Sequence, residues 1–218
     1  MTAAYDAHAE WYERLTVDAP PYVTRAREML VELLGPGADG CLDLCCGTGA
    51  HAATVRGTGR APFGVDVSRG QLRYAARRLP AVVGDAARLP IRDGAVPAVA
   101  CVLAHTDVPD YGAVVREAAR VLRPGGRFAH VGIHPCFVGA HADRRDPERW
   151  IIVGRYFDRG RSFDSWSPTG FRNRVGGWQV TMADLLNAIV GAGLRLERVE
   201  EDGDNGIADI LGLVAIRP

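Results

Sequence analysis

The feature of this sequence that most constrains its fold is a regular alternation of short apolar runs with helical patterns. Residues 111–122 show the helical pattern clearly, because their apolar side chains recur on one stripe and Asp110 can cap the first turn. Strands that alternate with helices of this length build a parallel sheet covered on both faces. The sequence therefore predicts an α/β fold with a doubly wound sheet. The strand candidates of this core are residues 41–45, 61–67, 81–83, 96–103 and 127–133.

Further elements are expected on both sides of this core. Two helical patterns precede it, at residues 3–15 and 21–34. After it, residues 181–192 indicate a helix, and residues 194–199 and 207–216 indicate strands.

The segment between residues 134 and 180 has no periodicity, yet it holds half of the aromatic side chains. A long aromatic segment inside one domain indicates a lid or binding segment, and a poorly ordered insertion is the alternative. The aromatic residues of this segment are Phe137, Trp150, Tyr156, Phe157, Phe163, Trp166, Phe171 and Trp178.

Length, charge and composition narrow the function. A chain of 218 residues with 47% hydrophobic residues suits one domain with a real core. No apolar stretch approaches the roughly 20 residues of a membrane span, and polar residues occupy the first positions, so we expect a cytoplasmic protein without a membrane partner. The net charge of zero argues against a nucleic-acid partner.

All 26 basic residues are arginine, which excludes a lysine Schiff base and a P-loop lysine. This composition is typical of a GC-rich bacterium. The cysteines are odd in number and, like the histidines, lack the spacing of metal ligands, so we expect reduced core thiols and no metal site. The five cysteines are Cys41, Cys45, Cys46, Cys101 and Cys136.

The strongest local signal is the run LDLCCGTG, in which a strand ends in a glycine turn that opens a helix. Gly47 and Gly49 let the backbone approach a ligand, and Asp43 is a carboxylate in an otherwise apolar strand. Asp66 follows about 20 residues later at the end of the second strand, where a carboxylate can accept both ribose hydroxyls. These residues alone do not separate a nicotinamide dinucleotide from an adenosyl sulfonium.

The segment GDAARLP at residues 84–90 adds an acid at the end of a third strand. The ordered series LDLCCGTG, GVDVS, GDAARLP and ARVLRPGGRF resembles the class I S-adenosylmethionine-dependent methyltransferases, in the broad group of the ubiquinone and menaquinone biosynthesis enzymes. The resemblance covers about the first 130 residues. It implies a Rossmann-like, seven-stranded sheet with an antiparallel last strand and a lid after the fifth strand.

The resemblance also implies S-adenosylmethionine as cofactor and methyl transfer to an O, N or C atom of a small molecule, as in natural-product metabolism. We expect one methyltransferase domain over residues 1–218, as a monomer or homodimer. Its expected parts are a helical cap at 1–38, a cofactor-binding core at 39–133, a substrate lid at 134–180, and a C-terminal helix and strands at 181–218.

The same resemblance assigns residues to parts of the cofactor. Asp43, Gly47 and Gly49 would face the methionine part, Asp66 the ribose, and Asp85 and Ala86 the adenine. Beneath the sulfonium would lie Leu103, Ala104 and His105, while Tyr5 and Trp11 would close over the cofactor. Cys45, Cys46 and Val67 complete the expected cofactor-binding set. Many relatives carry a histidine where this chain has the run from Trp178 to Thr181, so no role of that histidine is transferred.

Two histidines are the candidate general bases. His105 and His134 are expected at carboxyl ends of strands, and the alternative is that both are hydrogen-bonded wall residues. His130 should point the other way along its strand. The arginines of the lid segment suit a planar, anionic acceptor, and solvated arginines on an exposed loop are the alternative.

Two other functions remain open from the sequence. A nicotinamide-dependent reductase would share the glycine turn and Asp66, but the chain has no lysine for a Tyr-x-x-x-Lys catalytic pair. A cyclase-like enzyme or a binding module could use the same scaffold without methyl transfer.

Overall fold

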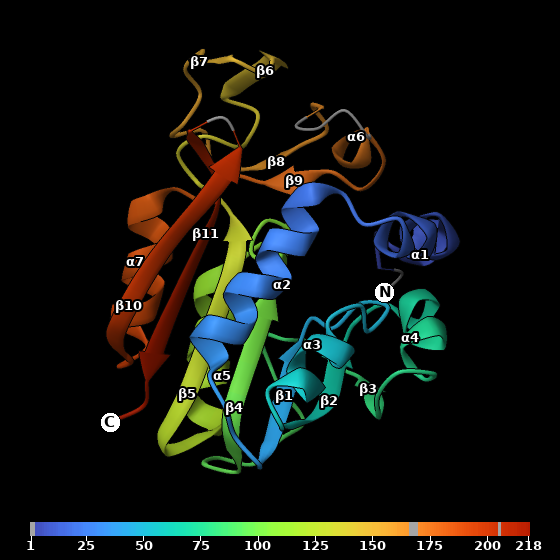
Figure 1. Ribbon diagram of the computed structural model, residues 1–218, viewed down its shortest axis with the longest axis vertical. Helices are drawn as coiled ribbons and strands as arrows, with labels where there is room; N and C mark the ends of the chain where they lie inside the picture. The colour runs from blue at the N-terminus through green and yellow to red at the C-terminus, as the bar shows by residue number, and fades with distance from the viewer. Residues whose placement is uncertain (1–2, 166–169, 205) are drawn as a thin grey trace.

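A computed structural model describes residues 3–165, 170–204 and 206–218 of the chain. Its centre is one seven-stranded sheet, and Figure 1 shows all of its strands from one edge to the other. In spatial order the strands are β10 (Arg195–Asp204), β11 (Ile207–Ile216), β5 (Leu122–Ile133), β4 (Val96–Val102), β1 (Gly40–Leu44), β2 (Ala61–Asp66) and β3 (Ala81–Val83).

Strand directions confirm the predicted topology. The pairs β1–β2, β1–β4, β2–β3 and β4–β5 are parallel, whereas β11 is antiparallel to both β5 and β10. Since β1 lies between β2 and β4, the strand order reverses beside it. Open α/β sheets bind ligands at such a switch point, at the carboxyl ends of the strands.

Helices cover both faces of the sheet. Their bounds are η1 (Asp6–His8), α1 (Ala9–Val17), α2 (Pro21–Leu34), α3 (Ala52–Gly57), α4 (Arg69–Ala75), α5 (Tyr111–Val121), α6 (Phe171–Val175) and α7 (Met182–Gly191). In Figure 1, α2 and α3 lie in front of the sheet, and α5 and α7 lie behind it. The short helices η1 and α1 contact α4 near the β3 edge.

Most helix ends follow the sequence signals. Pro21 opens α2 at its first position, Asp110 accepts a hydrogen bond from the Ala113 amide at 2.8 Å, and Thr181 forms a capping box with Asp184. The N-terminal pattern predicted at 3–15 is divided into η1 and α1, which ends two residues later. The cap, core and lid division itself stays a prediction.

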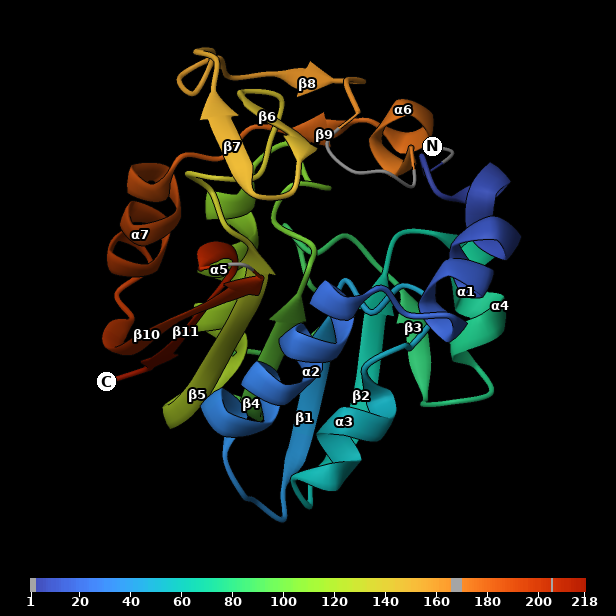
Figure 2. The ribbon, with the colours of Figure 1, turned by 45° about the horizontal axis from the view of Figure 1, so that its top comes forward.

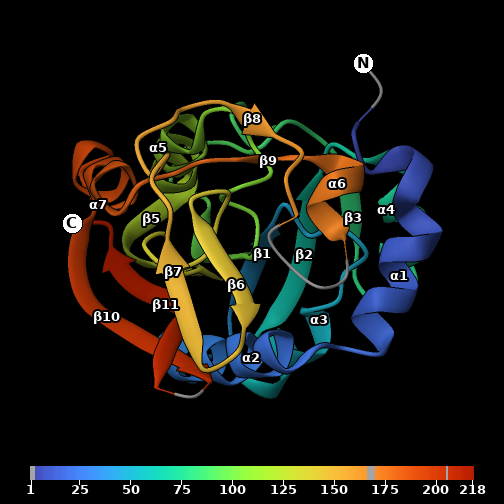
Figure 3. The same cartoon turned by 90° about the horizontal axis from the view of Figure 1, so that it is seen from above.

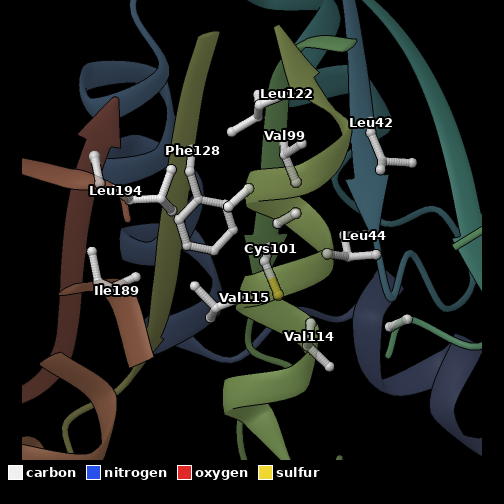
Figure 4. Close-up of a cluster of buried hydrophobic side chains, with 14 of the residues drawn as sticks. Leu42, Leu44, Val99, Cys101, Val114, Val115, Leu122, Phe128, Ile189 and Leu194 are labelled. Carbon is white, nitrogen blue, oxygen red and sulfur yellow. The ribbon is translucent and has the colours of Figure 1, made fainter. Parts of the chain in front are cut away.

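Apolar side chains fill the space between the sheet and α5 and α7. Phe128 and Leu42 from the sheet and Val115 and Ile189 from the helices belong to one cluster, and all four are fully buried (Figure 4). Burying a side chain of this size stabilises the fold by about 1.5–3 kcal/mol. The second core cluster lies under α2, whose Leu30 and Leu33 are also fully buried.

The segment 134–180 has more regular structure than its lack of periodicity indicated. It contains an antiparallel pair, β6 (Ala142–Asp146) and β7 (Arg149–Ile152), a second pair, β8 (Arg161–Ser162) and β9 (Gly177–Trp178), and the helix α6. The strands are two to five residues long and β6 is charged, which leaves no alternating pattern to detect. Trp166 lies outside the described residues.

This segment covers one end of the sheet. Figures 2 and 3 show β6, β7 and α6 above the ends of the central strands, with α1 beside α6. The covered end is the carboxyl end, because β5 runs directly into this segment. In the described part of the chain, no helix has the length and apolar character needed to cross a bilayer.

Candidate functional site

Left-handed backbone marks the carboxyl ends of two central strands. Cys45 follows β1 with φ of 59°, and Leu103 follows β4 with φ of 56°. Such values are strained for residues with a Cβ and gather at functional sites. Gly47 and Gly49 continue the turn after β1 with φ of 54° and 74°, where glycine carries no such strain.

The two glycines of this turn serve different purposes. A Cβ on Gly49 would lie 2.5 Å from Leu79 and 3.3 Å from the Ala75 backbone, so close packing against α4 requires glycine there. At Gly47 the nearest atom would be the Gln71 amide oxygen at 3.1 Å. The predicted backbone approach to a ligand therefore concerns Gly47 more than Gly49.

Asp66 holds the glycine turn in place. Its carboxylate accepts hydrogen bonds from the Gly47 amide at 2.8 Å and from the Ser68 amide at 2.7 Å. Burial raises the pKa of this carboxyl, and the two amide hydrogen bonds oppose that rise. The charge of Asp66 thus lies at the end of β2, beside the turn after β1.

Asp43 is a carboxyl in the interior of the sheet end. Its side chain is only 1% exposed, and Oδ2 has no hydrogen-bond partner among the described residues. Burial, with Cys101 and Asp66 nearby, raises the pKa of Asp43 to about 8. An acceptor of this kind is costly unless a donor or a cation reaches it. Asp43 Oδ2 is therefore a position where a bound donor or cation would stabilise the site.

The raised pKa of Asp43 predicts a pH-dependent stability. A carboxyl with an ordinary pKa of 3.8 and a folded pKa of about 8 stabilises the fold while neutral, and loses that contribution as pH rises. From about pH 6 to about pH 8, this group should lower the free energy of unfolding by up to about 1.4 kcal/mol per pH unit. Asp43→Asn should remove that slope. Thermal denaturation of both proteins at the two pH values measures it, and equal slopes would refute the role.

The other expected cofactor residues surround the same sheet end. Asp85 is exposed, and its Oδ1 accepts a hydrogen bond from the Ala87 amide at 2.9 Å. Val67 is 53% exposed, whereas Ala86 and Ala104 are buried. The Cys46 thiol occupies the space that a Cβ on Gly64 would need, so Cys46 packs against β2.

Asp107 joins the N-terminal cap to α6. The Tyr5 hydroxyl donates to Asp107 Oδ1 at 2.7 Å, and the Arg172 guanidinium pairs with the same carboxylate. Arg172 also donates to Thr106 Oγ1 at 2.7 Å and to the Gly176 carbonyl at 3.1 Å. Two segments 167 positions apart in sequence, at Tyr5 and Arg172, are thus fastened to the loop after β4.

Aromatic rings complete this closure. Phe171 of α6 stacks on Trp11 with ring centroids 5.8 Å apart, and it contacts Tyr5 and Tyr12 at 5.8 and 5.7 Å. The Arg174 guanidinium lies over the Trp11 ring, 5.0 Å from its centroid. The cap and α6 therefore form one cover, which includes the predicted aromatics Tyr5 and Trp11.

The two histidines expected as bases lie in enclosed positions. His105 is 1% exposed and packs edge-on against His130, with 5.2 Å between ring centroids; burial, with His130 nearby, keeps the pKa of His105 well below its usual value. His134 is also 1% exposed, and its Nε2 lies 2.6 Å from Glu201 Oε1. Their catalytic roles stay predictions.

A cavity of about 370 Å³ lies under the cover. Its apolar wall includes Leu15, Pro20, Val23, Leu103, Ile133 and Val138. Its polar groups include Tyr12, Tyr22, Arg25, His51, Arg144 and Asp209. Neither His105 nor His134 is in its wall, within the described residues. Leu103, from the expected cofactor set, has the left-handed backbone described above and also lines this cavity.

His51 is the cavity residue that the sequence analysis missed. It lies two positions after Gly49, just before α3, and is 8% exposed. The available signal was its position directly after the glycine turn, where a side chain can reach the ligand that the turn approaches. Its apolar neighbours in sequence gave no reason to separate it from a core histidine.

Comparisons with known proteins agree with this geometry. A family model described as a methyltransferase domain matches residues 42–130. Demethylmenaquinone methyltransferase of Mycobacterium tuberculosis H37Rv is 41% identical over 133 residues, which are 59% of this chain and 56% of that protein. The same enzyme of Mycolicibacterium gilvum is 44% identical over 92 residues, 42% of this chain and 40% of that one.

A solved structure extends the likeness beyond these segments. An S-adenosylmethionine-dependent methyltransferase from Mesorhizobium loti superimposes with a TM-score of 0.71 at 25% identity, covering 92% of this chain and 99% of that one. The sequence matches reported above cover at most about half of the two curated relatives. The family model, over residues 42–130, includes the glycine turn, whereas the M. loti superposition extends over 92% of the chain.

Proposed function

This chain belongs to the class I S-adenosylmethionine-dependent methyltransferases, and from that premise we propose that it methylates an O, N or C atom of a small molecule bound in the cavity. The observation that carries the proposal is the pair of buried carboxyls, Asp43 and Asp66, beside the Gly47 turn. A cationic ligand with a ribose would bring a positive charge to Asp43, whose Oδ2 has no partner among the described residues, and hydroxyl donors to Asp66.

The residues present fit the cofactor of that family. Asp43 would meet the cationic methionine part, because its Oδ2 has no partner among the described residues. The Asp66 carboxylate would accept the ribose hydroxyls, and the exposed Asp85 would accept a hydrogen bond from the adenine amino group. S-adenosylmethionine supplies an activated methyl group, so the protein needs to provide alignment more than activation.

The cover contributes by excluding water. Phe171, Trp11 and Tyr5 close one side of the sheet end, and Asp107 fastens them. A dry site strengthens the attraction between the Asp43 carboxylate and a sulfonium, since opposite charges interact more strongly at low dielectric. Leu103 lines the cavity, and we place the acceptor beside it.

Isothermal titration calorimetry tests this function with three ligands. We expect S-adenosylmethionine and S-adenosylhomocysteine to bind in the micromolar range, and NADH not to bind. Because Asp43 is largely neutral near pH 7 and would ionise beside a bound cation, S-adenosylmethionine should also release protons on binding. Titrations in two buffers of different ionisation enthalpy reveal that release. Binding of NADH alone would overturn the proposal and favour the reductase.

Turnover separates an enzyme from a binding module on the same scaffold. Release of S-adenosylhomocysteine with an acceptor supports methyl transfer, and cofactor binding without release favours the cyclase-like alternative. We further propose that the protein works in the cytoplasm on small molecules without a nucleic-acid partner, which its net charge of zero supports. Whether it is a monomer or a homodimer is a matter for ultracentrifugation.

A further inference from the structure

His51 combines three properties that the proposed methyl transfer leaves unused. It lines the cavity together with Leu103 and Tyr12. Its side chain is 8% exposed, and Nδ1 is buried without a hydrogen-bond partner in the described part of the chain. It also lies two residues after Gly49, so it belongs to the segment that begins with the glycine turn.

The imidazole of His51 is neutral at physiological pH. Burial, with the Arg27 guanidinium nearby, lowers its pKa to about 4. A neutral imidazole has one N–H donor and one nitrogen lone pair, so it can accept a proton. Other charged or titratable groups in the same cavity wall are Tyr12, Tyr22, Arg25, Arg144, Arg172, Asp204 and Asp209.

These other groups have partners of their own. The Arg25 guanidinium donates to both Asp209 oxygens at 2.7 Å and to Asp204 at 2.8 Å, and Arg172 is paired with Asp107. Burial raises the pKa values of Tyr12 and Tyr22, so both hydroxyls stay protonated and act as poor bases. Among the described wall residues, His51 is thus the group best suited to take up a proton.

Resting on the proposed function, we infer that the cavity takes a compact, largely apolar acceptor with one ionisable hydroxyl, and that His51 accepts the proton of that hydroxyl during methyl transfer. The apolar wall suits a hydrocarbon or aromatic body, and Phe171 and Tyr22 add aromatic side chains to it. A volume of about 370 Å³ matches a ligand of one or two rings, since ligand pockets start at about 300 Å³.

The step balances in atoms and charge. The hydroxyl oxygen forms a bond to the methyl carbon as the carbon–sulfur bond breaks, and that electron pair stays on sulfur. The hydroxyl proton passes to an imidazole nitrogen of His51 and later to water. One positive charge exists before transfer, on sulfur, and one after it, on the imidazole. Burial and the nearby Arg27 guanidinium, which lower the basicity of His51, disfavour the imidazolium, and the loss of the sulfonium charge as the proton arrives offsets part of that cost.

Two phenols of different acidity test this inference in the whole protein. With saturating S-adenosylmethionine, kcat/KM for phenol and for the more acidic 4-nitrophenol is measured between about pH 5.5 and about pH 9. Wild type should give a nearly flat profile with phenol, because its base is already neutral. His51→Ala should lose about 100-fold with phenol near pH 7. Its rate should then rise tenfold per pH unit, because only the phenolate reacts.

Several controls separate proton transfer from structure. The loss with 4-nitrophenol, which ionises near neutral pH, should be less than about tenfold, since little base is needed. Added imidazole should restore part of the His51→Ala rate with phenol. His8→Ala removes a histidine outside the cavity wall and should match wild type. His51→Asn repeats the test if the alanine variant denatures below the assay temperature.

Three results would overturn the inference. Equal losses with both phenols at every pH would reduce His51 to a structural residue. A pH-independent variant without imidazole rescue would do the same. A wild-type protein that binds S-adenosylmethionine but methylates neither phenol would reject the acceptor class while leaving the proposed function intact. Failure to bind S-adenosylmethionine would instead refute the proposed function itself.

Discussion

Asp66→Ala should weaken S-adenosylmethionine binding on the order of 100-fold or more while the protein stays folded. The carboxylate would lose two hydrogen bonds to ribose hydroxyls, and a hydrogen bond to a charged group contributes about 1.5–3 kcal/mol. It would also release the Gly47 amide, which it now holds at 2.8 Å, so the glycine turn loses its support. Calorimetric titration gives the dissociation constant directly.

Stability should change much less than affinity in this variant. Burial raises the pKa of Asp66, so its charged form is held in the fold at a cost, and removing it relieves part of that cost. Asp39→Ala is the matched control, because Asp39 is an exposed aspartate that pairs with Arg123 at 2.7 Å just before β1, at the amino end of the sheet. We expect its affinity to stay within twofold of wild type. Unchanged affinity in Asp66→Ala would remove Asp66 from the cofactor site.

Arg172→Ala should produce the largest loss of stability. Arg172 is 6% exposed and pairs with Asp107, whose carboxylate also accepts the Tyr5 hydroxyl. Removing one partner of a buried ion pair costs about 3–5 kcal/mol. Asp107, whose side chain is 19% exposed, would keep the Tyr5 hydroxyl as its partner, so we expect the lower end of that range. For a chain of this size the melting temperature should fall on the order of 10 °C. Chemical denaturation and calorimetry measure both quantities.

The comparison with Arg174→Ala isolates the buried pair. Arg174 lies on the same helix two residues later, but it is exposed and contacts only the Trp11 ring among the interactions seen for it. Its loss should cost less than about 1 kcal/mol. A further variant, Arg172→Ala with Asp107→Asn, should recover part of the stability, because the uncompensated charge is then gone. Equal effects of Arg172→Ala and Arg174→Ala would contradict the fastening role of Asp107.

The sheet was predictable because its signals are local. Each buried strand is a short apolar run, and each connecting helix shows its own period and cap, as in 111–122, observed at Tyr111–Val121. The antiparallel last strand came from the family resemblance, and the pairing of β11 with β5 and β10 confirms it. The lid was less predictable, since β8 and β9 have two residues each and pair only across a gap of 14 positions.

The candidate site divides in the same way. Asp43, Gly47 and Asp66 were found from sequence, because each lies in or just after a recognisable strand and a ligand-binding turn needs those residue types at that spacing. Their assignments to parts of the cofactor stay predictions. His51 and the Asp107–Arg172 pair were missed, because nothing local to them indicates that they meet the cavity or each other.

By itself, the sequence determined the parallel sheet, the turn after β1 and the acids at the strand ends, since periodicity and spacing act over a few residues. The tertiary structure alone decided which histidine faces the cavity and which carboxyls lack partners. Burial and hydrogen bonding depend on segments far apart in the chain, as Tyr5, Asp107 and Arg172 show. The pKa of Asp43, about 8, follows from that burial and could not be assigned from its place in a strand.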